Sequence, residues 1–380
     1  MNKPKIRFKG FEGEWKERKI GDALSINSGR DYKHLEEGDI PVYGTGGYML
    51  SVNERISDCD AIGIGRKGTI DKPQYLRAPF WTVDTLFFLI AKVGIDLDFA
   101  YNLSQVIGWR KYDESTGVPS LSKNNIEKIP ISLPSLPEQR ALASYFTALD
   151  AQIAASTSRL SSLKQIKAAS LLNMFPQKGE TVPRVRFKGF QGEWKKVKIG
   201  DVAPLTGGFA FQSGQFKTSG VPIIRISNIL SSGIVGGDFV YYNEFKGDSE
   251  FRLYKGDVVI AMSGATTGKV ATFEANDFGY QNQRVGKFSR TNLVNYELLS
   301  KLVSAPNFQK KIISKLTSSA QPNASSKDID SIDLVVPEET EEQRAIASYF
   351  TTLDAQITLH RKRLEKLKQI KAACLEKMFA

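Results

Sequence analysis

The sequence predicts an α+β fold with two mixed α/β domains, related by an internal repeat, and two long helices. Three observations predict it. The 380 residues contain two copies of one pattern, the two copies begin and end almost identically, and their middle segments differ in length and composition. A hydrophobic content of 41% is enough to bury a core in each of two domains.

The repeat is visible in long identical phrases. RFKGFEGEWK, from Arg7, returns 179 positions later as RFKGFQGEWK, from Arg186. EQRALASYFTALDAQI, from Glu138, returns 204 positions later as EQRAIASYFTTLDAQI, from Glu342. The offset grows by 25 residues between the two phrases, so the middle segment of the second copy is longer. The chain therefore combines a constant frame with two variable inserts.

The end of each copy has the spacing of a helix with one narrow apolar stripe. Pro137 and Pro337 mark the two helix starts, and a helix over 138–175 would be ~55 Å long. A helix this long with one apolar edge requires a partner, and we expect the partner to be its own copy; the alternative is that each helix packs on its own domain. The stripes consist of Leu142, Phe146, Leu149, Ile153, Leu160 and Leu163, and of Ile346, Phe350, Leu353, Ile357, Leu364 and Leu367.

The two inserts are rich in short strand-like runs bounded by glycine and proline. The runs are DIPVYG, DAIGIG and TLFFLI in the first insert, and VPIIRI, DFVYY, DVVIAM and KVATF in the second. We expect a helix over 99–112 in the first insert and helices over 296–304 and 308–316 in the second. Trp15 and Trp194 recur with the constant frame, which indicates buried core residues rather than base-stacking platforms.

The charge balance favours a polyanionic partner. The net charge is +11 and the sequence pI is about 9.3, and lysine and arginine that neutralise phosphates release condensed counterions. No stretch reaches the roughly 18 to 20 apolar residues of a membrane span, and the first ten residues lack the apolar core of a signal peptide, so we expect a cytoplasmic protein without a membrane partner. The two cysteines, Cys59 and Cys374, and the two histidines, His34 and His360, show no metal-ligand spacing.

Two glycine motifs are similar to nucleotide-binding loops but lack their context. The segment 63–68 satisfies GxGxxG, yet Pro73 and Pro79 exclude the long helix that must follow. In the segment 264–270 the spacing is one residue short of a phosphate loop, and Val270 stands where serine or threonine must reach magnesium. With two histidines in the chain and no nucleophile motif, we expect neither a catalytic residue nor a bound metal.

The same two loops suit contact with nucleic acid. Each follows a strand-like run, its glycines allow close approach to phosphate, and its polar side chains can reach phosphate or base edges. The alternative is a basic turn that contacts only solvent. The candidates are Arg66, Lys67 and Thr69 in the first loop, and Ser263, Thr267 and Lys269 in the second.

Further candidates for contact with double-stranded DNA lie in three polar runs. Amides are suited to adenine edges and arginine to guanine, although amides on a strand can equally satisfy the neighbouring backbone. The glycine-rich run PVYGTGGYML is of the sort that can enter a groove. The candidates are Arg225, Ser227 and Asn228; Gln281, Asn282, Gln283 and Arg284; and Tyr43, Thr45 and Tyr48.

Taken together, these features resemble the specificity subunits of type I restriction-modification systems over essentially the whole chain. The most specific phrases precede and begin the repeated helices: LPSLPEQRALASYFTALDAQI at Leu133 and PEETEEQRAIASYFTTLDAQI at Pro337. GVPSLSKNNIEKIPI and AQPNASSKDIDSIDL look like the segments that usually come before them, and FWTVDTLFFLI and GYQNQRVGKF are similar to strands of the family's target-recognition domains. The second phrase has one more residue between its first proline and the Glu-Gln pair, which leaves the exact helix start open.

The resemblance implies a non-catalytic subunit that binds a split DNA site. Target-recognition domains at 1–135 and 179–337 would each read one half-site, while helices at 136–178 and 338–380 would pair as an antiparallel coiled coil, set the gap and dock two methylation subunits. Two restriction subunits would complete the assembly. S-adenosylmethionine, ATP and magnesium are expected on those partners, and no cofactor on this chain. The rival interpretations are a stand-alone DNA-binding regulator and a nucleotide-using enzyme built on the glycine motifs.

Overall fold

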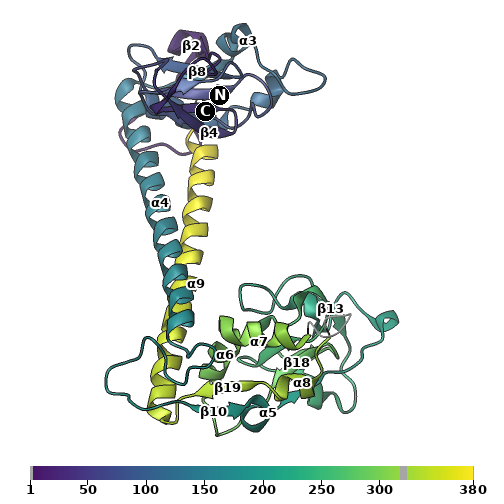
Figure 1. The fold of residues 1–380 in the computed structure, drawn as a ribbon. Helices are drawn as coiled ribbons and strands as arrows, with labels where there is room; N and C mark the ends of the chain where they lie inside the picture. Colours follow the sequence, from purple (N-terminus) through teal and green to yellow (C-terminus); the bar gives the residue numbers. More distant parts are fainter. Residues whose placement is uncertain (1–2, 317–322, 380) are drawn as a thin grey trace. The chain divides into compact units, whose positions relative to one another are not determined.

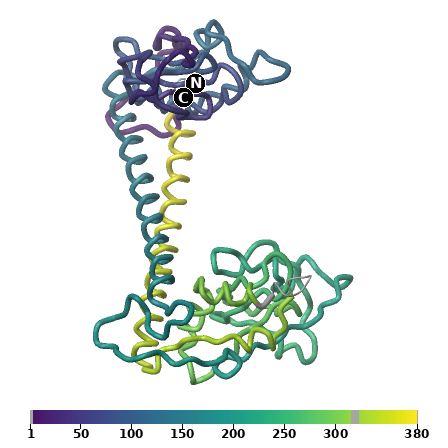
Figure 2. Tube along the Cα trace, in the orientation of Figure 1, coloured from purple at the N-terminus to yellow at the C-terminus, as the bar shows by residue number. Residues whose placement is uncertain are grey.

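The computed structural model describes residues 3–316 and 323–379, and it divides the chain into two compact units (Figures 1 and 2). Unit 1 comprises Met1–Arg159 and His360–Ala380, and unit 2 comprises Leu160–Leu359. The long helices α4 (Leu136–Asn173) and α9 (Thr340–Met378) each contribute residues to both units. Unit 1 is therefore assembled from the two ends of the chain. Residues 320–322, at the start of the AQPNASSKDIDSIDL segment, lie outside the described residues.

The strands of unit 1 form a sheet in the order β2-β8-β5-β6, a second in the order β4-β3-β7, and the pair β1-β9. The short helices α2 and α3 pack beside them. The bounds are β1 Lys16–Lys19, α1 Ile20–Ala23, β2 Leu24–Ser28, β3 Glu37–Gly44, β4 Gly47–Val52, β5 Ala61–Gly65, β6 Gln74–Leu76, β7 Trp81–Thr82, β8 Leu86–Ala91, α2 Leu97–Val106, η1 Trp109–Tyr112, α3 Lys123–Lys128 and β9 Pro130–Leu133.

Unit 2 repeats this plan with the sheets β11-β18-β15-β16 and β13-β12-β17-β14 and the pair β10-β19. The bounds are β10 Lys195–Lys198, α5 Ile199–Val202, β11 Leu205–Thr206, η2 Ser213–Gln215, β12 Val221–Ile224, η3 Ile226–Asn228, β13 Val240–Tyr242, η4 Asp248–Phe251, β14 Arg252–Leu253, β15 Val258–Ala261, η5 Gly264–Thr266, β16 Val270–Thr272, β17 Gly279–Gln281, β18 Val285–Phe288, α6 Tyr296–Ser304, α7 Pro306–Leu316, α8 Ser326–Asp330 and β19 Asp333–Val336. Most of the additional residues of the second insert lie between β12 and β15.

The Glu-Gln pair at the start of each long helix is a buried structural element. In unit 1 the Glu138 carboxylate is 2% exposed and accepts hydrogen bonds from Arg7 Nε and Nη2, both at 2.7 Å, and from Trp15 Nε1 at 3.3 Å. Gln139 accepts from the backbone nitrogen of Asp96, the residue that caps α2. These bonds hold the start of α4 against Arg7, Trp15 and the start of α2. This structural role accounts for the presence of the Glu-Gln pair in both copies.

Unit 2 contains the same arrangement. Glu342 is 1% exposed and accepts from Arg186 Nε at 2.7 Å and Nη2 at 2.8 Å, and Gln343 accepts from the backbone nitrogen of Asn295, which caps α6. One difference separates the copies. The indole nitrogen of Trp194 is buried and lacks a hydrogen-bond partner among the described residues, whereas that of Trp15 is paired.

The end of each long helix packs on the beginning of a repeat. Phe379, just after α9, contacts Trp15 and Phe99 in unit 1, and the backbone nitrogen of Ile6 donates to the carbonyl of Lys377. In unit 2, Phe175 stacks on Phe350 and contacts Trp194, and the nitrogen of Val185 donates to the carbonyl of Asn173. The two copies therefore bury equivalent phenylalanines against equivalent tryptophans.

Within each unit, the two long helices run antiparallel and make reciprocal contacts. In unit 1, Lys371 pairs with Asp150 at 2.7 Å and the hydroxyl of Tyr145 lies 3.4 Å from Cys374 Sγ. In unit 2 the equivalent pairs are Lys167 with Asp354 at 2.6 Å and Ser170 with Tyr349 at 2.8 Å. The predicted pairing of each helix with its copy is thus present in both units.

The apolar stripe nevertheless serves two purposes. Leu142 and Phe146 belong to the main core of unit 1, and Ile346 and Phe350 belong to that of unit 2. The beginning of each stripe therefore packs on its own domain, so the alternative interpretation holds for those turns. The remaining stripe residues are buried or half-buried, namely Leu149, Ile153, Leu160, Leu163, Leu353, Ile357, Leu364 and Leu367.

The structure resolves the open helix start, confirms the burial of two tryptophans and corrects one expected helix. The helix α4 begins two residues before Glu138 and α9 two residues before Glu342, so the additional residue of the second phrase lies ahead of the helix. Trp15 and Trp194 are both 2% exposed, which confirms that they are core residues. The helix expected over 99–112 is interrupted, because the chain leaves α2 at Val106 and resumes as the short 3-10 turn η1 after Gly108.

Candidate nucleic-acid interface

Three segments that the sequence singled out in unit 2 lie together at one edge of its sheets. The backbone nitrogen of Asn282 donates to the carbonyl of Ile224, and that of Met262 donates to the carbonyl of Arg284. Thr266 Oγ1 donates to the carbonyl of Ile226. Segments 225–228, 263–269 and 282–284 therefore form one surface, which we call the unit 2 rim.

The unit 2 rim carries cations that are not neutralised within the protein. Arg284 is exposed, and Arg225 and Lys269 are half-buried. None of the three forms an ion pair within the part of the chain that the structure describes, and the buried Nε of Arg225 has no hydrogen-bond partner there. Ser227 and Gln283 are exposed beside them, and Asn282 and Thr267 are half-buried. The amide oxygen of Asn282 accepts from the backbone nitrogen of Arg284 at 3.4 Å. This rim therefore offers positive charge without an internal ion-pair partner, and the exposed amide of Gln283, to an anionic ligand.

Asn228 does not take part in that surface, which corrects the prediction from the sequence. Its side chain is 1% exposed. The amide oxygen accepts from the backbone nitrogen of Arg225, and the amide nitrogen donates to the carbonyls of Gly236 and Asp238. The amide thus holds the backbone of the loop, and Arg225 is positioned by it.

Gln281 and Ser263 are likewise structural. Gln281 is fully buried, and its amide nitrogen donates to the carbonyls of Thr206 and Val285, both at 2.8 Å. Ser263 is 8% exposed and its backbone bridges to Asn323. Neither side chain is available for a base contact, because the pairing of distant strands encloses both of them. For Asn228 and Gln281 the alternative interpretation, amides that satisfy backbone groups, is the correct one.

In unit 1 the candidates of the glycine-rich run PVYGTGGYML surround the turn between the antiparallel strands β3 and β4. Tyr48 is 62% exposed, Tyr43 and Thr45 are half-buried, and the rings of Tyr43 and Tyr48 meet edge to face at 6.4 Å. Gln74 on β6 donates to the carbonyls of Gly44 and Thr45 at 2.9 and 3.2 Å, so it holds the turn against the neighbouring sheet. Sequence reasoning missed Gln74, since nothing local shows which turn it reaches.

The basic turn of unit 1 lies at the matching edge. Arg66 and Lys67 are exposed and Thr69 is half-buried. The backbone nitrogen of Arg66 donates to the carbonyl of Thr85, and that of Val83 donates to the carbonyl of Tyr43. Segments 43–48, 66–69 and 83–85 therefore form the unit 1 rim. Segment 83–85 was not identified as a candidate from the sequence. An alignment of FWTVDTLFFLI with GYQNQRVGKF could have found it.

A glycine in each unit allows the backbone to approach this edge. A Cβ on Gly29 would lie 2.0 Å from the carbonyl oxygen of Val83, and a Cβ on Gly208 would lie 2.3 Å from that of Gln281. No side chain fits at either position, so both rims depend on a glycine that precedes them by many residues.

A hydrogen-bonded ionic network adjoins the unit 2 rim through the strand β17. Asp248 accepts from Arg252 and from the hydroxyl of Tyr280, which lies one residue before Gln281 on β17. The hydrogen bonds from Arg252 and then from Tyr280 hold the pKa of Asp248 below its ordinary value, although burial opposes them. The carboxylate therefore stays ionised and internally paired at neutral pH.

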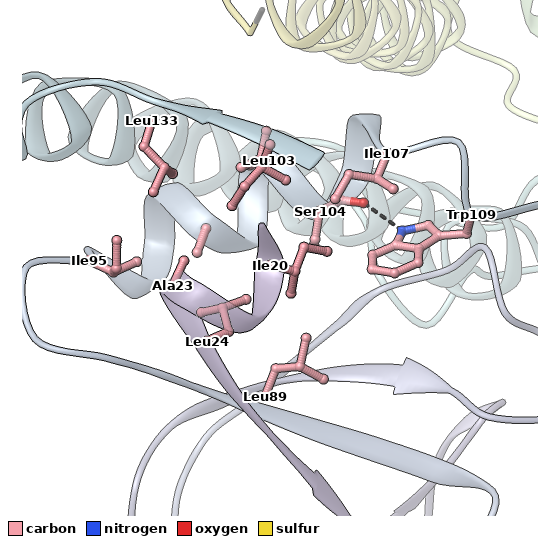
Figure 3. A pocket seen from close by; sticks show the side chains of 12 residues that line it. Ile20, Ala23, Leu24, Leu89, Ile95, Leu103, Ser104, Ile107, Trp109 and Leu133 are labelled. Atoms are coloured by element: carbon pink, nitrogen blue, oxygen red, sulfur yellow. Dashed lines mark hydrogen bonds between the residues drawn. The ribbon is translucent and has the colours of Figure 1, made fainter. Parts of the chain in front are cut away.

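The two glycine motifs continue into strands. Residues 63–68 are followed by β6 and residues 264–269 by β16, so neither presents a helix N-terminus to a phosphate. Within the described residues, no three His, Cys, Asp or Glu side chains gather as a metal site. The cavity in Figure 3 lies in the core of unit 1 between apolar side chains such as Ile20 and Leu103, and Trp109 donates across it to the Ser104 carbonyl at 2.8 Å.

Known proteins share this arrangement. The family described as type I restriction modification DNA specificity domain matches residues 12–165 and 191–369. The chain belongs to this family. It is accordingly a specificity subunit, the non-catalytic DNA-recognition component of a type I restriction-modification system. Both rims lie within the matched segments.

Similar specificity subunits come from distant organisms. The MjaVIII specificity subunit of Methanocaldococcus jannaschii is 24% identical over 295 residues, which are 74% of this chain and 68% of that protein. The EcoBI specificity subunit of Escherichia coli is 29% identical over 179 residues, 47% of this chain and 36% of that protein. At these identities most residues of the matched segments differ.

Solved structures show the same fold. The type I restriction-modification S subunit from M. genitalium matches with a TM-score of 0.71 at 16% identity, covering 100% of this chain and 99% of that one. A chain from a study of complex assembly and conformational transition of the type I R-M system matches with a TM-score of 0.54 at 16% identity, covering 97% and 98%. In the described part of this specificity subunit, no helix has both the length and the apolar content of a membrane span.

Proposed function

We propose that this specificity subunit binds a bipartite site in double-stranded DNA in the cytoplasm, with one half-site at each rim. The observation that carries the proposal is that the two rims share a backbone frame but carry different side chains. Tyr43 and Ile224 both accept a backbone hydrogen bond from the segment that follows β7 or β17. Beyond that bond, unit 1 presents Asp84 and Thr85 where unit 2 presents Gln283 and Arg284. A constant frame with variable contacts is what two different half-sites require.

The side chains of the unit 2 rim suit direct readout. Arginine can bond the O6 and N7 acceptors of guanine, which fits the guanidinium groups of Arg225 and Arg284, since neither forms an ion pair with the described residues. Gln283 has an amide that can bond N6 and N7 of adenine, and Lys269 is suited to phosphate. In unit 1 the exposed Arg66, Lys67 and Tyr48 supply the corresponding charge and contact area.

The long helices are proposed to set the gap between half-sites and to dock two methylation subunits, with two restriction subunits in the full assembly. Support comes from the reciprocal pairs Asp150–Lys371 and Asp354–Lys167, which fix the register of the two helices within each unit. S-adenosylmethionine, ATP and magnesium would be held by those partners. Four residues inserted after Ile153 would then lengthen the tolerated gap by about one or two base pairs, because four helical residues add ~6 Å.

A segment exchange tests the division of labour between the rims. Residues 22–132 are replaced with the matching segment of a relative of different specificity, and methylated adenines are mapped in cells that carry the complete system. We expect one half of the recognised site to change and the other half to stay the same. The reciprocal exchange, in unit 2, is the control. A change in both halves after either exchange would contradict independent reading by the two units.

A further inference from the structure

The turn between β7 and β8 in unit 1 and the turn between β17 and β18 in unit 2 are structurally equivalent. Each is joined to the same neighbours by backbone hydrogen bonds. In unit 1 the backbone nitrogen of Val83 donates to the carbonyl of Tyr43, and the carbonyl of Thr85 accepts from the nitrogen of Arg66. In unit 2 the nitrogen of Asn282 donates to the carbonyl of Ile224, and the carbonyl of Arg284 accepts from the nitrogen of Met262. The parallel strand registers agree, with Tyr43 opposite Thr82 and Ile224 opposite Gln281. Asp84 and Gln283 each lie between the two bonded residues, so they occupy the same position.

Asp84 is an exposed carboxylate in basic surroundings. Within 3–316 and 323–379 the structure gives its side chain no hydrogen bond and no ion pair. The exposed residues Arg30 and Arg66 lie on either side of it, since the nitrogen of Arg30 donates to Thr82 and that of Arg66 to Thr85. Asp84 is therefore the charged residue of this turn, and the two residues whose backbone nitrogens flank it, Arg30 and Arg66, are both cationic.

A free carboxylate at a DNA-binding surface is repelled by phosphate, unless it faces a hydrogen-bond donor. In the major groove the donors are the amino groups of adenine and cytosine. Adenine presents the N7 acceptor beside its amino group, and guanine and thymine present oxygen acceptors. An ionised carboxylate has no hydrogen to donate to any of these. Cytosine is the base whose edge offers a donor without an adjacent acceptor.

We propose that Asp84 is a specificity-determining residue of unit 1, and that its carboxylate accepts a hydrogen bond from the 4-amino group of a cytosine in the first half-site. This inference rests on the proposed function of the unit 1 rim. The equivalent Gln283 has both a donor and an acceptor, which suits adenine. The two units then use one structural position to select different bases.

The test uses the specificity subunit assembled with its methylation subunits. Binding is measured for wild type and Asp84→Asn on duplexes that carry each base pair at each position of the mapped first half-site. We expect wild type to prefer cytosine at one position by about 5- to 150-fold. Asp84→Asn should lose that preference and accept adenine there, because an amide can bond N6 and N7. Asp39→Asn, an exposed carboxylate at the other end of β3, is the matched control and should change nothing.

A base analogue identifies the group that is bound. Replacing the selected cytosine with 2-pyrimidinone removes the 4-amino group, which should weaken wild type by the same factor but leave Asp84→Asn unaffected. Retention of the full cytosine preference by Asp84→Asn would overturn the proposal, as would a uniform gain in affinity for all sequences, which would make Asp84 only a source of phosphate repulsion. A wild-type complex with no preferred first half-site would overturn the proposed function together with this inference. The preference of the complex for the second half-site, which unit 2 reads, distinguishes these cases. It stays intact in the first two outcomes, in which only the proposal for Asp84 fails.

Discussion

Replacing Glu342 with Gln should destabilise unit 2 far more than an ordinary surface substitution. The change keeps the size of the side chain but removes the charge that neutralises Arg186. Glu342 is 1% exposed and the Arg186 side chain 14%, and two bonds of 2.7 and 2.8 Å join them. The geometry is that of a bidentate arginine–carboxylate pair in a mostly water-excluded site.

The expected magnitude follows from that burial. Removing one partner of a buried ion pair costs about 3–5 kcal/mol, because the other charge is left uncompensated. The lower end, about 3 kcal/mol, applies here, since Arg186 also donates to the carbonyls of Gln191 and Gly192 and keeps those acceptors. For a unit of this size the melting temperature should fall by roughly 6–12 °C.

Thermal unfolding followed by tryptophan fluorescence can be assigned to the units. Trp194 is in unit 2, whereas Trp15, Trp81 and Trp109 are in unit 1. Amide hydrogen exchange then checks that the loss of protection is centred on unit 2. Arg186→Met, alone and with Glu342→Gln, completes a double-mutant cycle that isolates the pairwise energy.

Two controls make the result decisive. Glu341→Gln changes a neighbouring side chain that is 72% exposed and should cost little. Glu138→Gln repeats the experiment in unit 1, where Trp15 also bonds the carboxylate. A loss below about 1 kcal/mol for Glu342→Gln would refute the reasoning, because it would place the pair among surface salt bridges.

Three further predictions concern the rims and the helices. Gly208→Ala should weaken binding to the second half-site, since its Cβ would lie 2.3 Å from the Gln281 carbonyl oxygen, whereas Gly207→Ala, with no atom within 4 Å, should bind normally in the same gel-shift titration. Arg284→Ala should cost about 1–3 kcal/mol of binding free energy at one base position, whereas Lys269→Ala should weaken binding to all sequences alike and reduce the salt dependence by about one counterion. The control is Lys255→Ala, because Lys255 precedes the start of β15 whereas Lys269 follows its end. Uniform weakening of binding by both Arg284→Ala and Lys269→Ala would make Arg284 a phosphate contact. Burial raises the pKa of Asp354, but Lys301 and Lys167 outweigh burial, so the pKa is lowered overall. The ionised carboxylate therefore stabilises the fold fully above the unfolded pKa of about 3.9, and this contribution is lost as the pH falls through the folded pKa. Denaturation of wild type and Asp354→Asn should show a difference in stability at pH 7 that narrows below about pH 4, and a difference independent of pH would contradict the assignment.

The sequence by itself determined the features that depend on local pattern. Repeated phrases identified the two copies, the spacing of apolar residues identified α4 and α9, and strand-like runs bounded by glycine and proline identified strands such as β5 and β15. The recurrence of Trp15 and Trp194 with the constant frame was enough to predict their burial. Each of these signals is contained in a short window or in a comparison of the chain with itself.

Only the tertiary structure decided which polar side chains are free. Asn228 and Gln281 have the same residue types as Asn282 and Gln283, yet the first two are enclosed and their amide nitrogens donate to backbone carbonyls, while the others are partly or fully exposed. Asp84 joined the unit 1 rim because β3 pairs in parallel with β7, about forty residues along the chain. The physical reason is that burial and hydrogen-bond saturation depend on which distant strands meet, and no local pattern of residues records that pairing.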